Sequence, residues 1–270
     1  MKSNAEMRKE SYAVVRSRWF WIIFGVTLLL QGICHGAGWL LGSLHGSMGI
    51  VSPVDFFSKK LEMLRQGLDY TLPTAEAYRQ MAYAGTMEML VGYVLGAVAL
   101  FGITAVLLKA VADDRNDVLG AAFGGFGRPL GVTWLLMVMN FFVGLWMLLL
   151  IVPGIVAIYR YRAAWYLKSE HPDWGALKCL GESKRIMRGR KFQAFLLDMS
   201  FVFMAMLALF AALVPMSLAG LLGGAVAAMA TSLFIALLVA AMVYLGVWCI
   251  VARTVFYREA RDSAPCPAGS

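Results

Sequence analysis

The sequence predicts an all-α protein that crosses a membrane about six times, with short amphipathic helices at the membrane surface. Three observations lead to this prediction: the composition, the long uncharged stretches and the placement of the basic residues. Of the 270 residues, 60% are apolar and 15% are charged, and the mean hydropathy is +0.71. Such values are typical of helical membrane proteins and exclude most soluble domains. We expect a single membrane-embedded domain at residues 1–262 and a disordered tail at residues 263–270.

The net charge indicates which partners to expect, and the spacing of the cysteines indicates whether disulfides or metal sites are expected. The formal net charge is +8, but the basic residues flank apolar stretches and form no nucleic-acid-binding motif. Anionic lipids on the cytoplasmic side of a bilayer are therefore expected as partners, and nucleic acid is not. The four cysteines, at positions 34, 179, 249 and 266, have neither CxxC nor paired spacing. This spacing predicts no disulfide and no metal site, and the sequence indicates no cofactor.

The first half of the chain alternates basic and uncharged segments. Residues 1–18 contain five Lys or Arg and predict an entry helix that lies on the membrane surface. Residues 19–41 are uncharged and form the first predicted span, which is too long for the apolar core of a signal peptide. Residues 43–86 predict an outer loop, residues 89–108 a second span, and residues 109–128 a return to the inner side.

The central stretch decides the topology. Residues 129–159 contain no charge, and as one helix they would be about 46 Å long, whereas the hydrocarbon core is about 30 Å thick. Pro153 removes a backbone donor, and Gly154 readily adopts the backbone angles of a tight turn. We therefore predict a helical hairpin that breaks at Pro153 and Gly154, with arms near residues 130–152 and 155–167. A single kinked helix whose tail lies on the surface is the alternative.

A strongly basic segment follows at residues 168–191, with seven Lys or Arg against three acids. Asp173 can cap a helix that has one apolar and one charged face, as expected of a helix on an anionic leaflet. A partner-binding helix is the rival interpretation. The candidate contacts with anionic lipid are Lys178, Lys184, Arg185, Arg188, Arg190 and Lys191.

The last apolar region completes the count of spans. Residues 199–252 have no charge and predict two spans, near residues 192–214 and 228–252. If the central stretch were one span, the basic segment at residues 168–191 would lie outside, whereas a hairpin keeps it inside. With the hairpin, both termini are cytoplasmic, and the inner segments hold 18 Lys or Arg against 4 in the outer loops.

The stretch GLWMLLLIVPGIVAIYRYRAAWYL resembles the bacterial integral-membrane family catalogued as domain of unknown function 975. Residues 123–127, 183–200 and 254–257 are similar to further elements of that family. The resemblance covers roughly residues 118–259 and implies a multi-pass protein of the bacterial cytoplasmic membrane. It supplies no activity, ligand or catalytic residue.

Ionisable residues within the predicted spans are candidates for a functional site. Arg160 and Arg162 are two residues apart and so point about 200° apart around a helix, which means that only one of them can face inward. Arg160 and Asp198 lie at similar depths from the basic segment, and we predict that they pair. The alternative is that both arginines extend to lipid phosphate.

The sequence contains no motif for intramembrane proteolysis and no phosphate-binding loop, so we do not expect an enzyme. Two classes of function remain. The chain is expected to be a non-enzymatic membrane factor that acts through partners or envelope organisation. The alternative is a carrier or exporter of a small solute, peptide or lipid, favoured by the Pro-Gly break and Arg160.

Overall fold

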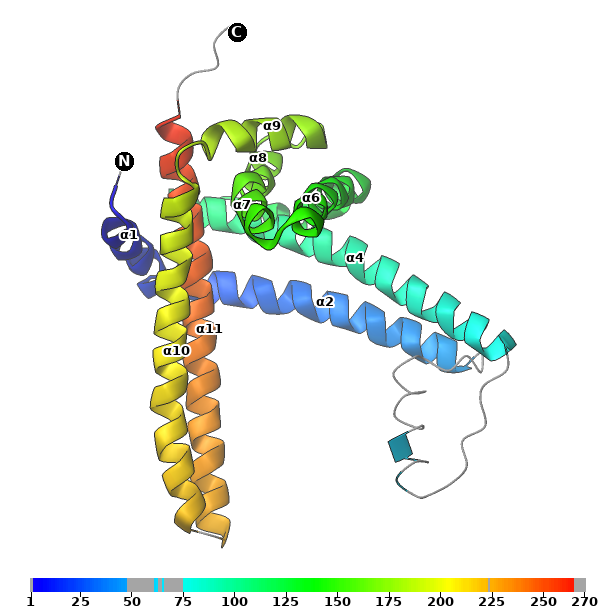
Figure 1. Cartoon of the computed structure of the whole chain (residues 1–270), viewed down its shortest axis with the longest axis vertical. Helices are drawn as coiled ribbons and strands as arrows, with labels where there is room; N and C mark the ends of the chain where they lie inside the picture. The colour runs from blue at the N-terminus through cyan, green and yellow to red at the C-terminus, as the bar shows by residue number, and fades with distance from the viewer. Residues whose placement is uncertain (1, 48–60, 63–64, 66–74, 223, 265–270) are drawn as a thin grey trace, which may run out of the picture.

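The computed structural model describes residues 2–47, 61–62, 65, 75–222 and 224–264, and Figure 1 shows that helices dominate it. No strand occurs among these residues, which confirms the all-α prediction. Most of the predicted outer loop at 43–86 and the end of the predicted tail, from residue 265 onward, lie outside the described residues.

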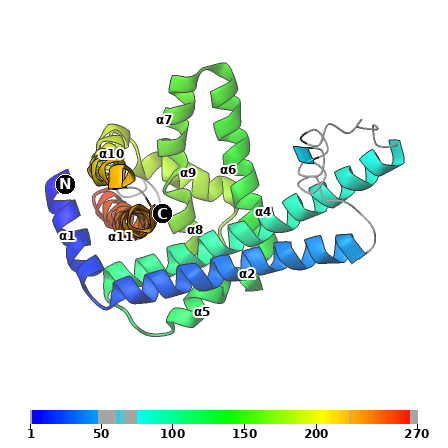
Figure 2. The same cartoon turned by 90° about the horizontal axis from the view of Figure 1, so that it is seen from below.

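Three antiparallel helical hairpins form the framework of the part of the chain that the structure describes. In Figure 1 the hairpin of α10 and α11 runs vertically and that of α2 and α4 runs across the view, while Figure 2 shows the hairpin of α6 and α7 projecting in a third direction. In each hairpin, the helix ends next to the connection lie far from the place where the three hairpins meet. The helices are α2 (Trp19–Ser47), α4 (Ala75–Ala112), α6 (Pro129–Leu149), α7 (Ile151–Tyr161), α10 (Lys191–Leu222) and α11 (Gly224–Asp262).

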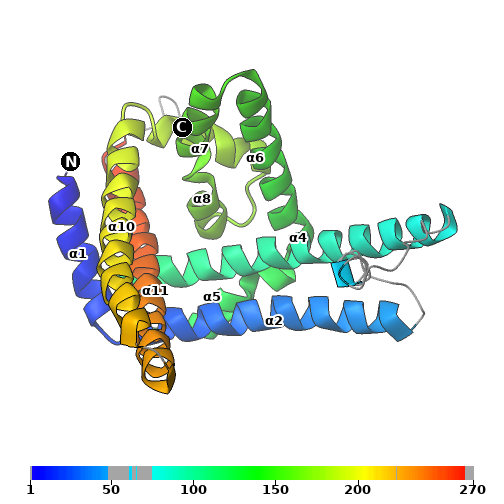
Figure 3. The ribbon, with the colours of Figure 1, turned by 60° about the horizontal axis from the view of Figure 1, so that its bottom comes forward.

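The three hairpins meet at what we call the junction, which consists of their helix ends opposite the turns together with five short helices. Figure 3 shows the N-terminal helix, α8 and the C-terminal end of α11 in this region, away from the hairpin turns. The short helices are α1 (Asn4–Arg16), α5 (Val118–Phe123), the 3-10 helix η1 (Gly124–Gly127), α8 (Ala164–Glu170) and α9 (Ala176–Ile186).

The buried side chains gather at the junction. One apolar cluster joins α1, α8, α9, α10 and α11, and includes Met7, Leu197 and Tyr257, which are at most 2% exposed. Towards the turns the helices instead expose large apolar side chains, and Phe210 and Leu237 are both 58% exposed. Side-chain packing within the chain is therefore concentrated where the hairpins meet.

Within the described residues, five helices contain segments long and apolar enough to cross a membrane, namely α2, α4, α6, α10 and α11. The chain therefore has the features of a multi-pass membrane protein. The predicted arm at residues 155–167 differs. Helix α7 ends at Tyr161, and its 11 residues extend only about 16 Å. It lies antiparallel to α6, so the predicted hairpin is present, but its second arm is too short to cross a bilayer.

The break of this hairpin is at Leu150 and not at Pro153 and Gly154, so that part of the prediction is wrong. Leu150 has extended backbone angles, with φ −163° and ψ 146°. Pro153 lies in the first turn of α7, where a helix does not need the missing N–H. Gly154 serves close packing: a Cβ there would lie 2.9 Å from Cα of Met147 on α6. Glycine thus lets the two arms approach each other.

Candidate functional site

A buried cluster of polar side chains surrounds Asp198 on α10. Its carboxylate accepts two hydrogen bonds from Arg162, both of 3.0 Å, one to each oxygen. Nε of Arg253 on α11 donates to Oδ1 at 3.1 Å, and the hydroxyl of Tyr159 donates to Oδ2 at 3.2 Å. The Asp198 side chain is 11% exposed and that of Arg162 17%. Because buried charges need partners, this cluster joins α7, α10 and α11 at the junction.

The predicted pair of Arg160 and Asp198 is wrong, because the partner of Asp198 on this segment is Arg162. As their spacing requires, only one of the two arginines faces inward, and it is Arg162 rather than Arg160. The depth comparison assumed one helix from Arg160 to the basic segment, whereas α7 ends at Tyr161 and the chain turns at Arg162. The turn directs Arg162 towards α10, while Arg160 lines a surface pocket with Trp146.

A pocket of about 380 Å³ opens beside this cluster. Its polar side chains come from α6, α7, α10 and α11, and apolar side chains form the rest of its wall. The polar residues are Asn140, Tyr159, Arg162, Asp198 and Arg253. The sequence predicts Asp198 as a site residue, but it does not single out Arg253.

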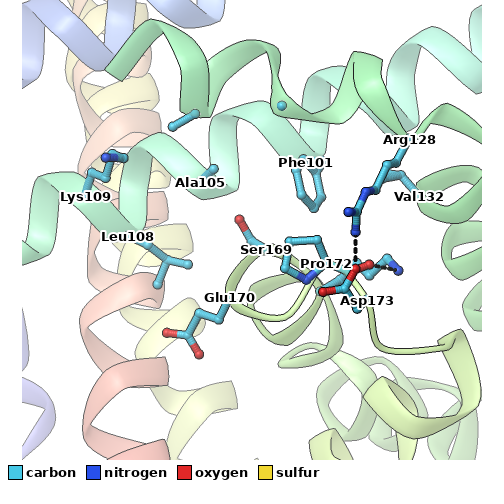
Figure 4. Close-up of a pocket in the computed structure, with 13 residues that line it drawn as sticks. Phe101, Ala105, Leu108, Lys109, Arg128, Val132, Ser169, Glu170, Pro172 and Asp173 are labelled. Atoms are coloured by element: carbon cyan, nitrogen blue, oxygen red, sulfur yellow. Dashed lines mark hydrogen bonds and ion pairs between the residues drawn. The ribbon is translucent and has the colours of Figure 1, made fainter. Parts of the chain in front are cut away.

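A second pocket, of about 510 Å³, lies between α4, η1 and the turn from α8 to α9. Figure 4 shows Phe101 and Val132 near the ion pair of Arg128 with Asp173. Lys168, only 6% exposed, donates to the backbone carbonyls of Pro172 and Trp174, at 2.8 Å each, and so fixes this turn. The cations of this pocket are thus used largely in holding the junction together.

The sequence predicts that the apolar face of the helix in the basic segment rests on lipid. In the structure, the apolar face of α9 packs within the chain instead. That face, which includes Cys179 and Leu180, is buried against α6, α7 and α8. Burial raises the pKa of the Cys179 thiol above its usual value, and an inert thiol is expected there. Of the candidate lipid contacts, Lys178 and Arg188 are exposed, while Lys184, Arg185, Arg190 and Lys191 are half-buried.

Two of the half-buried cations have partners within the chain. Arg185 forms an ion pair with Glu182 at 2.7 Å. Arg190 donates to the backbone carbonyl of Ser263 at 2.8 Å and also to that of Ala260, and thereby satisfies carbonyl groups at the end of α11. The free surface for lipid headgroups is therefore smaller than the sequence suggested.

Within the described part of the chain, no group of three or more His, Cys, Asp or Glu side chains is placed to hold a metal ion.

The segment that contains both the Asp198 cluster and α9 can be compared with known families. Residues 133–264 match the model of a family described as "Protein of unknown function (DUF975)". The resemblance to this family is confirmed over these residues, and the similar element predicted at residues 123–127 lies outside the match. No curated protein and no solved structure matches the chain.

The family-like elements of the sequence hold the junction. The buried hydroxyl of Ser183 donates to the backbone carbonyl of Arg160 at 2.9 Å. Gly189 has a φ of +76°, which favours glycine. The hydroxyl of Tyr257 donates to Glu170 at 2.6 Å. These residues join α7, α8, α9 and α11, so their roles in this structure are positional.

Proposed function

We propose that this protein is a non-enzymatic factor of the bacterial cytoplasmic membrane that acts through partner proteins or through organisation of the envelope. The observation that supports this most is the division of the molecule: charged and polar contacts gather at the junction, and apolar hairpins project from it. Basic residues favour the cytoplasmic side, so the junction would face the cytoplasm, with both termini and α9.

The position of α6 and α7 fits this topology. The short α7 returns the chain to the junction without a complete crossing, which keeps the basic segment at residues 168–191 on the same side as the N-terminus. The tip of the hairpin is apolar, and Leu148 and Ile151 are 88% and 72% exposed. Exposure of these apolar side chains to water is unfavourable, and their contact with lipid is favourable. We infer that this hairpin enters the bilayer from the cytoplasmic side.

The surface of the hairpins supports action through partners. Only 11–17% of the residues in the apolar windows of α2, α6, α10 and α11 are buried within the chain, against 44% for α4. The exposed surface is available to lipid, to other membrane proteins or to further copies of the chain. Lys178 and Arg188 would contact anionic headgroups on the cytoplasmic side.

A carrier or exporter of a small solute, peptide or lipid is the second candidate. The pocket beside Asp198 favours it, because carriers bind their cargo at polar sites near broken helices. A carrier must expose such a site alternately to the two faces of the membrane. The two proposals therefore differ in whether the pocket can be reached from one face of the membrane or from both.

Accessibility of Asn140, an exposed residue of this pocket, tests the proposal. The native cysteines are replaced by alanine, and Asn140→Cys is treated with a membrane-impermeant thiol reagent on intact cells and on inverted vesicles. We expect labelling from the cytoplasmic face at most, with Lys178→Cys as the control for that face. Labelling of Asn140→Cys from both faces would favour the carrier and contradict our proposal.

A further inference from the structure

We propose that the pocket beside Asp198 binds the phosphate group of a phospholipid, held by the guanidinium groups of Arg162 and Arg253. This inference does not rest on the proposed function, because a bound lipid is compatible with either class of membrane protein. It follows from the hydrogen-bonding capacity of the cluster, its charge and the walls of the pocket.

The carboxylate of Asp198 is saturated as an acceptor. Its two oxygens offer about four lone-pair sites, and they accept two bonds from Arg162, one from Arg253 and one from Tyr159. No further donor can be satisfied by this carboxylate. Any remaining donor of the cluster must find another acceptor.

Both arginines have such donors. A guanidinium group has five N–H groups, and on Asp198 Arg162 uses two and Arg253 only Nε. Among the described residues, the terminal nitrogens of Arg253 have no oxygen acceptor, and the thiol of Cys249 is only a weak hydrogen-bond partner of this guanidinium group. The Arg253 side chain is 38% exposed and lines the pocket. The unused N–H groups are thus available to an occupant of the pocket.

The charge of the cluster indicates an anion. Two guanidinium groups face one carboxylate, which leaves one positive charge uncompensated in a region of low dielectric constant. A phosphodiester has one negative charge and several strong acceptor oxygens, and guanidinium groups bind such groups through paired hydrogen bonds. A phosphodiester therefore supplies both the charge and the acceptors that the cluster lacks.

The walls of the pocket favour a lipid over free phosphate. Met139, Val143, Ile158 and Trp165 line it together with the polar residues, and its volume of about 380 Å³ leaves room beyond a phosphate group. The surrounding helices belong to the apolar hairpins, whose outer faces can accommodate acyl chains. A phospholipid would place its phosphate on the arginines and its glycerol and acyl chains along the apolar wall.

Thermal unfolding of the intact protein in a neutral detergent tests the inference. The probe is dioctanoyl phosphatidylglycerol, added at high salt so that exposed charges are screened. We expect it to raise the unfolding midpoint, and we expect Arg253→Gln to need about tenfold more lipid for half of the effect, since a hydrogen bond to a charged group is lost. Arg188→Gln, which removes the same charge from an exposed position, should respond like the unchanged protein.

Two further measurements complete the test. Arg253→Lys keeps the charge but loses the planar fork, so it should bind the lipid with intermediate affinity, and it replaces Arg253→Gln if that variant does not fold. Inorganic phosphate at the same concentration should not shift the midpoint. An equal shift by inorganic phosphate would show that the ligand is a soluble anion. If the Arg253 variants needed the same lipid concentration as the unchanged protein for half of the shift, the proposed phosphate site would be wrong.

Discussion

The junction and the turn-side ends of the hairpins are stabilised in opposite ways. At the junction, apolar side chains pack against one another and charged groups such as Asp198 and Glu170 have several partners. Towards the turns, the large apolar side chains face outward, and in a bilayer they would meet lipid. Association of helices within lipid has little hydrophobic driving force. The junction should therefore decide whether the chain folds, and the arms should tolerate apolar substitutions.

The largest expected effect is at the buried ion pair. Arg162→Leu leaves Asp198 without its bidentate partner, and loss of one member of a buried pair costs about 3 kcal/mol of unfolding free energy. Arg160→Leu is the matched control, since no ion pair of Arg160 is found within the described residues, and it should cost less than about 1 kcal/mol. Reversible unfolding in detergent micelles measures both. Equal losses in the two variants would contradict the assignment of Arg162.

The next effect tests the close approach of α6 and α7. In Gly154→Ala the new Cβ would lie 2.9 Å from the Met147 Cα, so the arms must separate, at a cost of about 2 kcal/mol. Gly144→Ala, where a Cβ meets nothing within 4 Å, should leave stability nearly unchanged. The same unfolding assay compares them, and a stable Gly154→Ala would show that the hairpin is looser than described.

A smaller effect is expected where Arg190 holds the end of α11. Arg190→Gln removes its bonds to the carbonyls of Ala260 and Ser263, and about 1.5 kcal/mol of unfolding free energy should be lost. Arg188→Gln, two residues away and exposed, is the control and should have no effect in neutral detergent. If the two substitutions were equivalent, Arg190 would act only as a surface charge.

The smallest effect concerns lipid at the exposed side of α9 and of the turn that follows it, where Arg188 lies. In bilayer discs, anionic lipid should stabilise the protein relative to neutral lipid, and Arg188→Gln should reduce that difference by about 1 kcal/mol. High salt should abolish the contribution of Arg188, because surface charges are screened. A salt-independent difference would indicate that α9 faces a protein partner instead.

The general architecture could be predicted because it depends on composition and charge. Uncharged stretches and the positions of Lys and Arg suffice to predict paired helices with the basic segments together. The hairpin break could not be placed from local rules, since Pro153 is acceptable in the first turn of a helix and Leu150, an ordinary helix former, is the extended residue.

The candidate site was predicted only in part, for a related reason. Asp198 was evident as an acid within an apolar segment, but its partners depend on tertiary packing. Arg162 reaches it because α7 ends one residue earlier, and Arg253 reaches it from α11, 55 residues away in the chain. Neither contact leaves a local signal in the sequence.

The most direct test of the account is to determine which side of the membrane each end of the hairpins occupies. In a protein without its native cysteines, single cysteines replace Lys178 at the junction and Ser43 and Ser217 near two hairpin turns; all three positions are exposed. We predict that an impermeant thiol reagent labels Ser43→Cys and Ser217→Cys in intact cells, and Lys178→Cys only after permeabilisation. Labelling of Lys178→Cys in intact cells, or of Ser43→Cys and Ser217→Cys from opposite faces, would contradict a cytoplasmic junction with both of these hairpin ends on the outer face of the membrane.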